Sequence, residues 1–263
     1  MAVHGGGLAG LGILVTRPAH QAEGLCKLIE AQGGRAYRFP ALEILDPLDP
    51  RPLQLTAAQL DDYDWAIFIS ANAVDRALAT ILALRDWPEP TRIAVIGRSS
   101  AQALQRHGLS PDLVPENRFD SEALLALPAM QRVEGQHVVI FRGDGGREHL
   151  AETLRQRGAR VDYVEAYRRA RPSADSGPLL EQWQAGAIDI VVVNSAESLN
   201  NLADLVGKTG AVLLRKTPLL VVSERMVPLA QQLGLRQTPV VAENATDAAV
   251  LQALATWRTA QQQ

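Results

Sequence analysis

The stretches GILVTRP (Gly12 to Pro18) and HVVIFRG (His137 to Gly143) decide the fold. Each is a short apolar run followed by an arginine, and Arg142 lies 125 positions after Arg17. A self-similarity at a fixed separation constrains the architecture of a whole chain, because each copy must form the same structural unit. The two stretches therefore indicate an internal repeat.

The match between the copies continues along the chain. Ser70 in SANAV corresponds to Ser195 in SAESL at the same separation, and Asp120 corresponds to Asp247 at a separation two residues longer. Small insertions in surface loops account for this drift. One unit is therefore expected to occur twice.

Seven apolar runs alternate with segments of helical periodicity: GILVT, DWAIFIS, RIAVIG, HVVIF, DIVVVNS, PLLVVS and PVVAEN. Short runs rich in Val and Ile are typical of buried parallel strands in α/β proteins. No Gly/Ser-rich linker separates the copies, and the loops at 47–52 and 171–178 are candidate domain edges. We therefore expect two similar, doubly wound parallel-sheet domains of flavodoxin-like or Rossmann-like type.

Composition excludes several classes of protein. The 263 residues carry a formal net charge of −3, so the chain lacks the basic field that nucleic-acid binding requires. No apolar run approaches the ~18 residues of a membrane span, and the start of the chain does not resemble a secretory signal. Cys26 lies in a set with Ala22, Leu25 and Ile29 at helical spacing, which indicates core packing. A cytoplasmic protein is expected.

The glycine-rich stretch FRGDGGREHL (Phe141 to Leu150) is not a nucleotide site, because it has neither GxGxxG nor GxxxxGK[ST] spacing. It leaves Arg142 at a strand end beside a helix start, an arrangement that attracts anions. Arg17 occupies the same place in the first copy, where Pro18 replaces glycine. These arginines could bind a ligand or pair with a carboxylate, and the sequence leaves both open.

Other side chains occur where strands become helices. Ser70 and Ser195 are predicted to cap helix N-termini, whose neighbouring N–H groups could still bind anions. The five histidines form no HExxH motif and no serine lies in a GxSxG elbow, so neither a metal site nor a serine nucleophile is expected. Tyr167 ends the stretch RVDYVEAYR, where its phenol could donate a proton or simply pack at a domain edge.

Taken in order, these motifs resemble the uroporphyrinogen-III synthase family. The resemblance covers nearly the whole chain and rests on LVTRP, FISANAV, VIGRSSAQAL, VIFRGDGGREHL, VEAYRR, VVVNSAESL and VVAENATDAAVLQAL. It implies two α/β domains joined by a two-stranded linker, with the active site in the interdomain cleft. The implied domains are residues 1–39 plus 168–263 and residues 40–167, not a division between the copies near Glu134.

The resemblance also implies a reaction. The family's enzymes are lyases that convert hydroxymethylbilane to uroporphyrinogen III, inverting the last pyrrole ring through a spiro intermediate, with neither metal nor organic cofactor. The bilane carries an acetate and a propionate on each pyrrole, which suits helix N-termini and arginines. Hand-over of the bilane from hydroxymethylbilane synthase and a monomeric enzyme are expected on the same basis.

Candidate site residues follow from the same match. Tyr167 corresponds to the family's tyrosine and is expected to assist departure of the hydroxyl group. Met226 replaces a hydroxyl residue found in some members, so its neighbours are the better candidates. The expected substrate-binding residues are Arg17, Ser70, Asn72, Ser100, Arg142, Gly143, Ser195, Ser223, Arg225 and Thr246.

Two other readings of the sequence stay open. Paired α/β domains also occur in non-catalytic sensors, here of a tetrapyrrole or another polycarboxylate. A nucleotide-dependent enzyme is disfavoured, because the glycine spacing is wrong.

Overall fold

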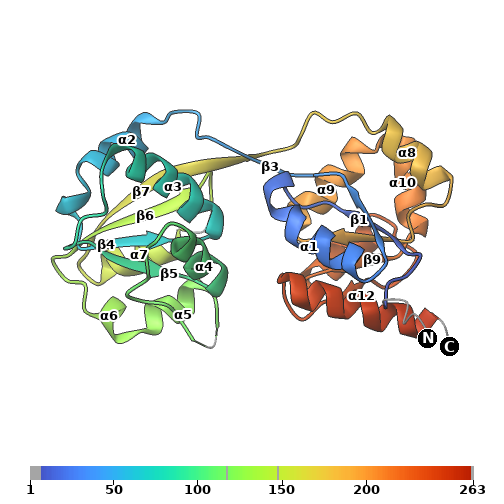
Figure 1. The fold of residues 1–263 in the computed structure, drawn as a ribbon. Coiled ribbons are helices and arrows are strands. Elements are labelled where there is room, and N and C mark those ends of the chain that lie inside the picture. Colours follow the sequence, from blue (N-terminus) through green and yellow to red (C-terminus); the bar gives the residue numbers. More distant parts are fainter. Residues whose placement is uncertain (1–6, 117, 147, 262–263) are drawn as a thin grey trace. The chain divides into compact units, whose positions relative to one another are not determined.

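The computed structural model describes residues 7–116, 118–146 and 148–261 (Figure 1). The chain divides into two compact units. Unit 1 contains the described residues up to Glu43 and from Ala170 onward, and unit 2 contains Ile44–Arg169. The chain therefore passes between the units twice, and both crossings lie a few residues after the boundaries expected from the resemblance.

Unit 1 contains a parallel sheet whose strand order is β2-β1-β8-β9-β10. Its strands are β1 (Gly12–Val15), β2 (Arg35–Arg38), β8 (Ile190–Val193), β9 (Leu219–Val221) and β10 (Val240–Val241). This order is that of a flavodoxin-like doubly wound sheet, in which the chain reverses its direction of progress between the first and third strands. In this chain that switch point lies between β1 and β8.

Helices cover both faces of this sheet. They are α1 (Ala19–Ala31), α8 (Gly177–Gln184), α9 (Ala196–Leu205), α10 (Gly207–Lys216), the 3-10 helix η2 (Glu224–Met226), α11 (Val227–Gln232) and α12 (Asp247–Gln261). Ile13 and Ile190 pack with residues of α1 and α12, whereas their strand neighbours Leu14 and Val191 pack with residues of α8 to α11. Successive side chains point to opposite faces, so a strand buried on both faces must be apolar throughout.

Unit 2 contains a sheet in the order β3-β7-β6-β4-β5. Its strands are β3 (Glu43–Leu45), β4 (Trp65–Phe68), β5 (Arg92–Val95), β6 (His137–Gly143) and β7 (Arg160–Ala170). β5, β4, β6 and β7 run parallel to one another, and a parallel bridge between Ala94 and Leu113 extends the β5 edge. The switch point of this sheet lies between β6 and β4.

The helices of unit 2 also surround their sheet. They are α2 (Arg51–Ala58), η1 (Leu60–Asp62), α3 (Ala71–Leu84), α4 (Arg98–Arg106), α5 (Ser121–Ala126), α6 (Pro128–Gln131) and α7 (His149–Gln156). Ile67 and Ile140 pack with residues of α5, α6 and α7. The adjacent Phe68 and Phe141 are fully buried and stack with ring centroids 4.9 Å apart, and α3 contacts their strands.

The two copies of the repeat exchange strands. β1 and β2 of the first copy share a sheet with β8 and β9 of the second, where β1 pairs with β8, and β6 and β7 of the second copy share a sheet with β4 and β5 of the first. A side-chain bond marks one such contact, because Thr16 Oγ1 donates to the carbonyl oxygen of Val192 at 2.8 Å. Both sheets therefore have the same internal order.

The structure confirms the predicted α/β fold, and each of the seven apolar runs contains a strand. Cys26 is fully buried in α1, as expected, and burial raises the pKa of its thiol. The short strands β2 and β3 were not predicted. Within the described ranges, no helix has both the length and the apolar character needed to cross a membrane.

Candidate active site

The predicted site residues lie mainly where strands end and helices begin. In unit 1, Arg17 follows β1 and Ser195 follows β8. In unit 2, Ser70 follows β4 and Gly143 ends β6. In doubly wound sheets, ligands bind beyond the carboxyl ends of the strands at the switch point, so this is the edge where a site is expected.

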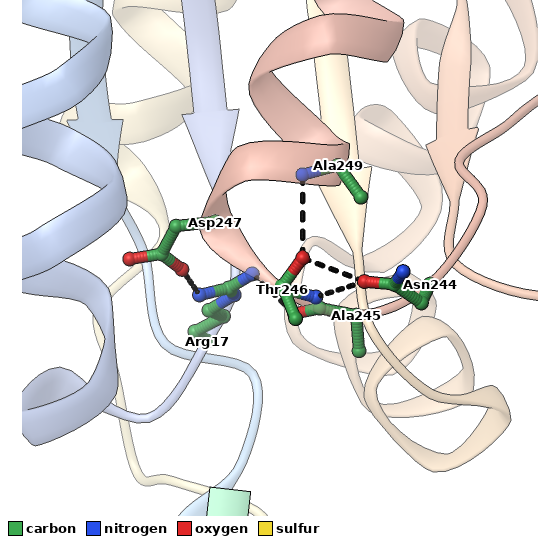
Figure 2. A network of polar contacts seen from close by, with 6 residues as sticks. All are labelled: Arg17, Asn244, Ala245, Thr246, Asp247 and Ala249. Atoms are coloured by element: carbon green, nitrogen blue, oxygen red, sulfur yellow. Dashed lines mark hydrogen bonds and ion pairs between the residues drawn. The ribbon is translucent and has the colours of Figure 1, made fainter. Parts of the chain in front are cut away.

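Arg17 is anchored inside unit 1 (Figure 2). Its side chain forms an ion pair with Asp247, the first residue of α12, and Nη2 donates to the carbonyl oxygen of Ala245 at 3.0 Å. Arg17 is only 8% exposed, and its Nε has no hydrogen-bond partner among the described residues. The carboxylate pairing that the sequence left open is thus present here.

Thr246 organises the turn beside this pair (Figure 2). Its hydroxyl donates to Asn244 Oδ1 at 2.6 Å and accepts the backbone N–H of Ala249 at 3.3 Å. The backbone N–H of Thr246 donates to the same Asn244 oxygen. Thr246 is exposed, and these bonds fix the start of α12, which carries Asp247.

Arg142 has an equivalent position in unit 2 but different partners. Its Nη1 donates to Glu148 at 2.9 Å, its Nε donates to the carbonyl oxygen of Gly145 at 3.1 Å, and its guanidinium lies 4.4 Å from the ring centre of Tyr163. The hydrogen bond from Arg142 lowers the pKa of the Glu148 carboxyl, and burial raises the pKa of Tyr163. Arg142 is 6% exposed, so both repeat arginines are buried and paired.

Tyr167 contacts Ser70 at the switch point of unit 2. The two hydroxyl oxygens are 3.2 Å apart, and Ser70 Oγ also accepts the backbone N–H of Ala73 at 3.1 Å. Ser70 therefore caps α3 as predicted. Tyr167 is 5% exposed, and its ring lies against Gly143. Three predicted site residues thus meet at one place.

Ser195 has the corresponding position in unit 1 and caps α9, as predicted, by accepting the backbone N–H of Ser198 at 3.0 Å. Its hydroxyl lies 2.8 Å from that of Ser198 instead of from a phenol. The preceding residue, Asn194, has a buried Oδ1 with no hydrogen-bond partner among the described residues. Sequence reasoning missed Asn194, although a polar residue directly after the apolar run IVVV was a signal for it.

The remaining predicted residues are dispersed. Asn72 is half-buried in the first turn of α3, whereas Ser100 is 2% exposed within α4. Ser223 accepts the backbone N–H of Arg225 at 3.3 Å, and the Arg225 side chain is exposed. Met226 is 4% exposed and packs in the core of unit 1, which explains why an apolar residue is accepted there.

A cavity of about 260 Å³ lies in unit 2 between the sheet and helices α5 and α7. Arg142 and Tyr163 line it together with four apolar side chains, Ile69, Ile96, Ile140 and Leu150. Asp120 and Glu122 also face it, so it is a poor place for a substrate that carries carboxylates. Tyr167 is not part of its lining.

A further polar cluster lies at the opposite, amino-terminal edge of this sheet. Tyr63 donates to Asp162 at 3.0 Å, and Nε2 of His137 lies 2.7 Å from the same carboxylate oxygen. Burial raises the pKa of Tyr63 to about 12, and the hydrogen bond to Asp162 is the second cause of this shift. Burial opposes ionisation of Asp162, but the hydrogen bonds from His137 and Tyr63 outweigh it and lower the pKa of that carboxyl. The cluster ties the starts of the strands together.

Comparison with known proteins extends this picture. The profile of the family described as Uroporphyrinogen-III synthase HemD matches residues 23–252. Uroporphyrinogen-III synthase of Salmonella typhimurium is 37% identical over 93% of this chain and its own full length, and that of Escherichia coli is 36% identical over the same shares. A crystal structure of a mutant uroporphyrinogen III synthase from Thermus thermophilus covers 96% of this chain and 100% of its own, with a TM-score of 0.62 at 19% identity. That likeness supports the fold. The family profile and the two relatives show that the chain belongs to the uroporphyrinogen-III synthase family.

Proposed function

We propose that this protein is a lyase that cyclises hydroxymethylbilane to uroporphyrinogen III with loss of one water molecule. The match of nearly the whole chain to the family carries the assignment. The observation that carries the mechanism is the phenol of Tyr167, held at the switch point of unit 2 by Ser70. A phenol keeps its proton at neutral pH and can donate it to a leaving oxygen.

In the proposed reaction, Tyr167 assists the first step. The bond between the terminal carbon and its hydroxyl oxygen breaks, the oxygen takes the electron pair and the phenol proton, and water leaves. The resulting azafulvenium cation is stabilised by its own pyrrole. Attack at the substituted carbon of the last ring then gives the spiro intermediate, which fragments and recloses. A proton lost from carbon in the last step restores the phenol.

Most of the catalysis is proposed to come from positioning. The bilane closes without an enzyme to the uninverted isomer, so the protein must select one of two reactive geometries. Backbone N–H groups in the first turns of α3 and α9 are suited to the acetates and propionates. Asn72, Ser195, Ser223, Arg225 and Thr246, all at or near helix starts, are the side chains proposed to support them.

The cellular setting is part of the same proposal. The protein acts in the cytoplasm as a monomer and receives its labile substrate from hydroxymethylbilane synthase. Size-exclusion chromatography with light scattering, with and without the synthase, tests this part.

The decisive experiment supplies freshly made hydroxymethylbilane to the purified protein and separates the oxidised products by isomer. Mainly type III product is expected. Only type I product, formed at the rate seen without protein, would contradict the enzymatic assignment and favour a non-catalytic tetrapyrrole-binding protein.

Tyr167→Phe tests the mechanism separately. We expect kcat to fall severalfold to about 100-fold, because ionisation without the phenol and positioning both continue. Far-UV circular dichroism and Tm serve as the control for folding. Unchanged turnover in this variant would remove Tyr167 from the reaction.

A further inference from the structure

A β-bulge controls where Tyr167 points. The pairing of β6 with β7 shifts between Arg142 and Gly143, so that Arg142 lies opposite Glu165 but Gly143 lies opposite Tyr167. Regular pairing would have placed Ala166 opposite Gly143. A bulge re-aims the side chains that follow it, since successive residues of a strand face opposite sides.

Gly143 provides the space that the re-aimed ring occupies. A Cβ atom built on Gly143 would lie 2.7 Å from Cζ of Tyr167 and 3.0 Å from its hydroxyl oxygen, closer than any side chain could approach. The φ of Gly143 is not in the left-handed region, so the backbone does not itself require glycine. Glycine is needed there because the Tyr167 ring lies across the end of β6.

The Tyr167 hydroxyl contacts Ser70 on the far side of β6. β6 lies between β7 and β4, and the hydroxyl of Tyr167 reaches Ser70, directly after β4, at 3.2 Å. Ser70 Oγ already accepts the backbone N–H of Ala73. Either hydroxyl can be the donor in the contact between Ser70 and Tyr167. When the O–H of Ser70 donates to the phenol oxygen, the phenol proton is available to another acceptor.

We infer that Ser70 and Gly143 are positioning residues that hold the Tyr167 hydroxyl at the switch point with its proton directed toward the substrate's leaving oxygen. This inference rests on the proposed function. As the carbon–oxygen bond breaks, the phenol proton moves to the departing oxygen, and the phenolate that remains accepts the O–H of Ser70. The two residues therefore act through Tyr167 and not by binding substrate carboxylates.

The first test is a double-mutant cycle that follows type III formation. Ser70→Ala is expected to lower kcat about 5- to 10-fold with KM nearly unchanged, and Ser70→Thr, which keeps the hydroxyl and the helix cap, should retain most activity. In the Tyr167→Phe background, Ser70→Ala should cause no further loss. Ser195→Ala removes the matching cap of α9, and its effect on kcat, whatever its size, should multiply with that of Tyr167→Phe.

The second test does not depend on activity. In protein labelled with ¹³C at Cζ of tyrosine, the Tyr167 signal is identified by its loss in Tyr167→Phe. We expect this signal to shift in Ser70→Ala and Gly143→Ala and to stay in place in Ser195→Ala. Gly143→Ala should also lower kcat about 10-fold or more.

The outcomes separate this inference from the proposed function. Wild-type protein without type III activity would contradict the function, while the Tyr167 signal would still decide whether Ser70 and Gly143 hold the ring. The positioning role would be overturned if the effects of Ser70→Ala and Tyr167→Phe on kcat multiply. It would also be overturned if the Tyr167 signal does not shift in Ser70→Ala or in Gly143→Ala. A KM increase with unchanged kcat in Ser70→Ala would instead make Ser70 a substrate ligand.

Discussion

The carboxyl edges of the two sheets start from the same repeat and end with different chemistry. In unit 1, Arg17 pairs with Asp247, and the capping serine Ser195 contacts Ser198. In unit 2, Arg142 pairs with Glu148, and the capping serine Ser70 contacts Tyr167. Both arginines are buried and both serines cap a helix, so the copies retain the same scaffold.

Two substitutions between the copies create the difference. The first copy has Pro18 and Leu42 where the second has Gly143 and Tyr167. Pro18 carries ring atoms where Gly143 has no side chain, and a leucine has no proton to donate. The comparison teaches that repeating a backbone repeats its helix caps and its buried arginines, but neither the carboxylate partners of those arginines nor the phenol that we propose to be reactive.

The largest expected difference between the two units is in the stability lost when the carboxylate partner of each buried arginine is removed. Asp247→Ala should lower the stability of unit 1 by about 3 kcal/mol, because it leaves the buried Arg17 guanidinium without a carboxylate. Glu148→Ala is the matched variant and should cost clearly less, since Glu148 is 53% exposed and Arg142 keeps its contacts with Gly145 and Tyr163. Calorimetric unfolding of both variants measures the difference. Equal losses would mean that the two pairs are energetically equivalent.

The serine caps should behave alike in stability. Ser70→Ala and Ser195→Ala each remove a side chain that accepts a backbone N–H, and each should cost about 1 kcal/mol. Thermal unfolding at neutral pH provides the comparison, with the corresponding threonine variants as controls that keep the cap. A much larger loss for Ser70→Ala would show that its contact with Tyr167 also stabilises the fold.

The smallest expected effect depends on pH. The hydrogen bond from Arg142 lowers the pKa of the Glu148 carboxyl below its ordinary value, so the pair's contribution to stability is fully present above that ordinary value and disappears as pH falls through the folded-state pKa. Glu148→Gln should therefore have a slightly lower Tm than wild type at pH 7, and the two should have the same Tm at an acidic pH below the folded-state pKa. A Tm difference that is the same at both pH values would contradict this account of the pair.

Local patterns in the sequence were sufficient for the strands and caps. The run IVVV at Ile190–Val193 is buried on both faces, and such a run has few alternatives to a central parallel strand. Ser70 and Ser195 stand directly between apolar strands and helices, where a cap is the expected role. By contrast, β2 (Arg35–Arg38) is half-polar and β3 has three residues, so neither produces a strong pattern.

Long-range contacts could not be predicted in the same way. Asp247 lies 230 residues from Arg17, and nothing local to either residue indicates the pair. The bulge before Gly143 depends on register between two strands, which the sequence of neither strand reveals. Ser100 is a candidate whose deep burial was not predicted, because the serine has the same hydroxyl whether it faces outward or inward.

The exchange of strands between the copies determines the order in which the protein can assemble during synthesis. Residues 44–169 form unit 2 without any later segment, so that unit can fold as soon as it has left the ribosome. β1 and α1 are made before unit 2, yet β1 pairs on one side with β8, which begins at Ile190. Until then the apolar strand Gly12–Val15 lacks that partner and is exposed to chaperones or to aggregation. A strand made before unit 2 thus obtains its partner only after unit 2 has been made.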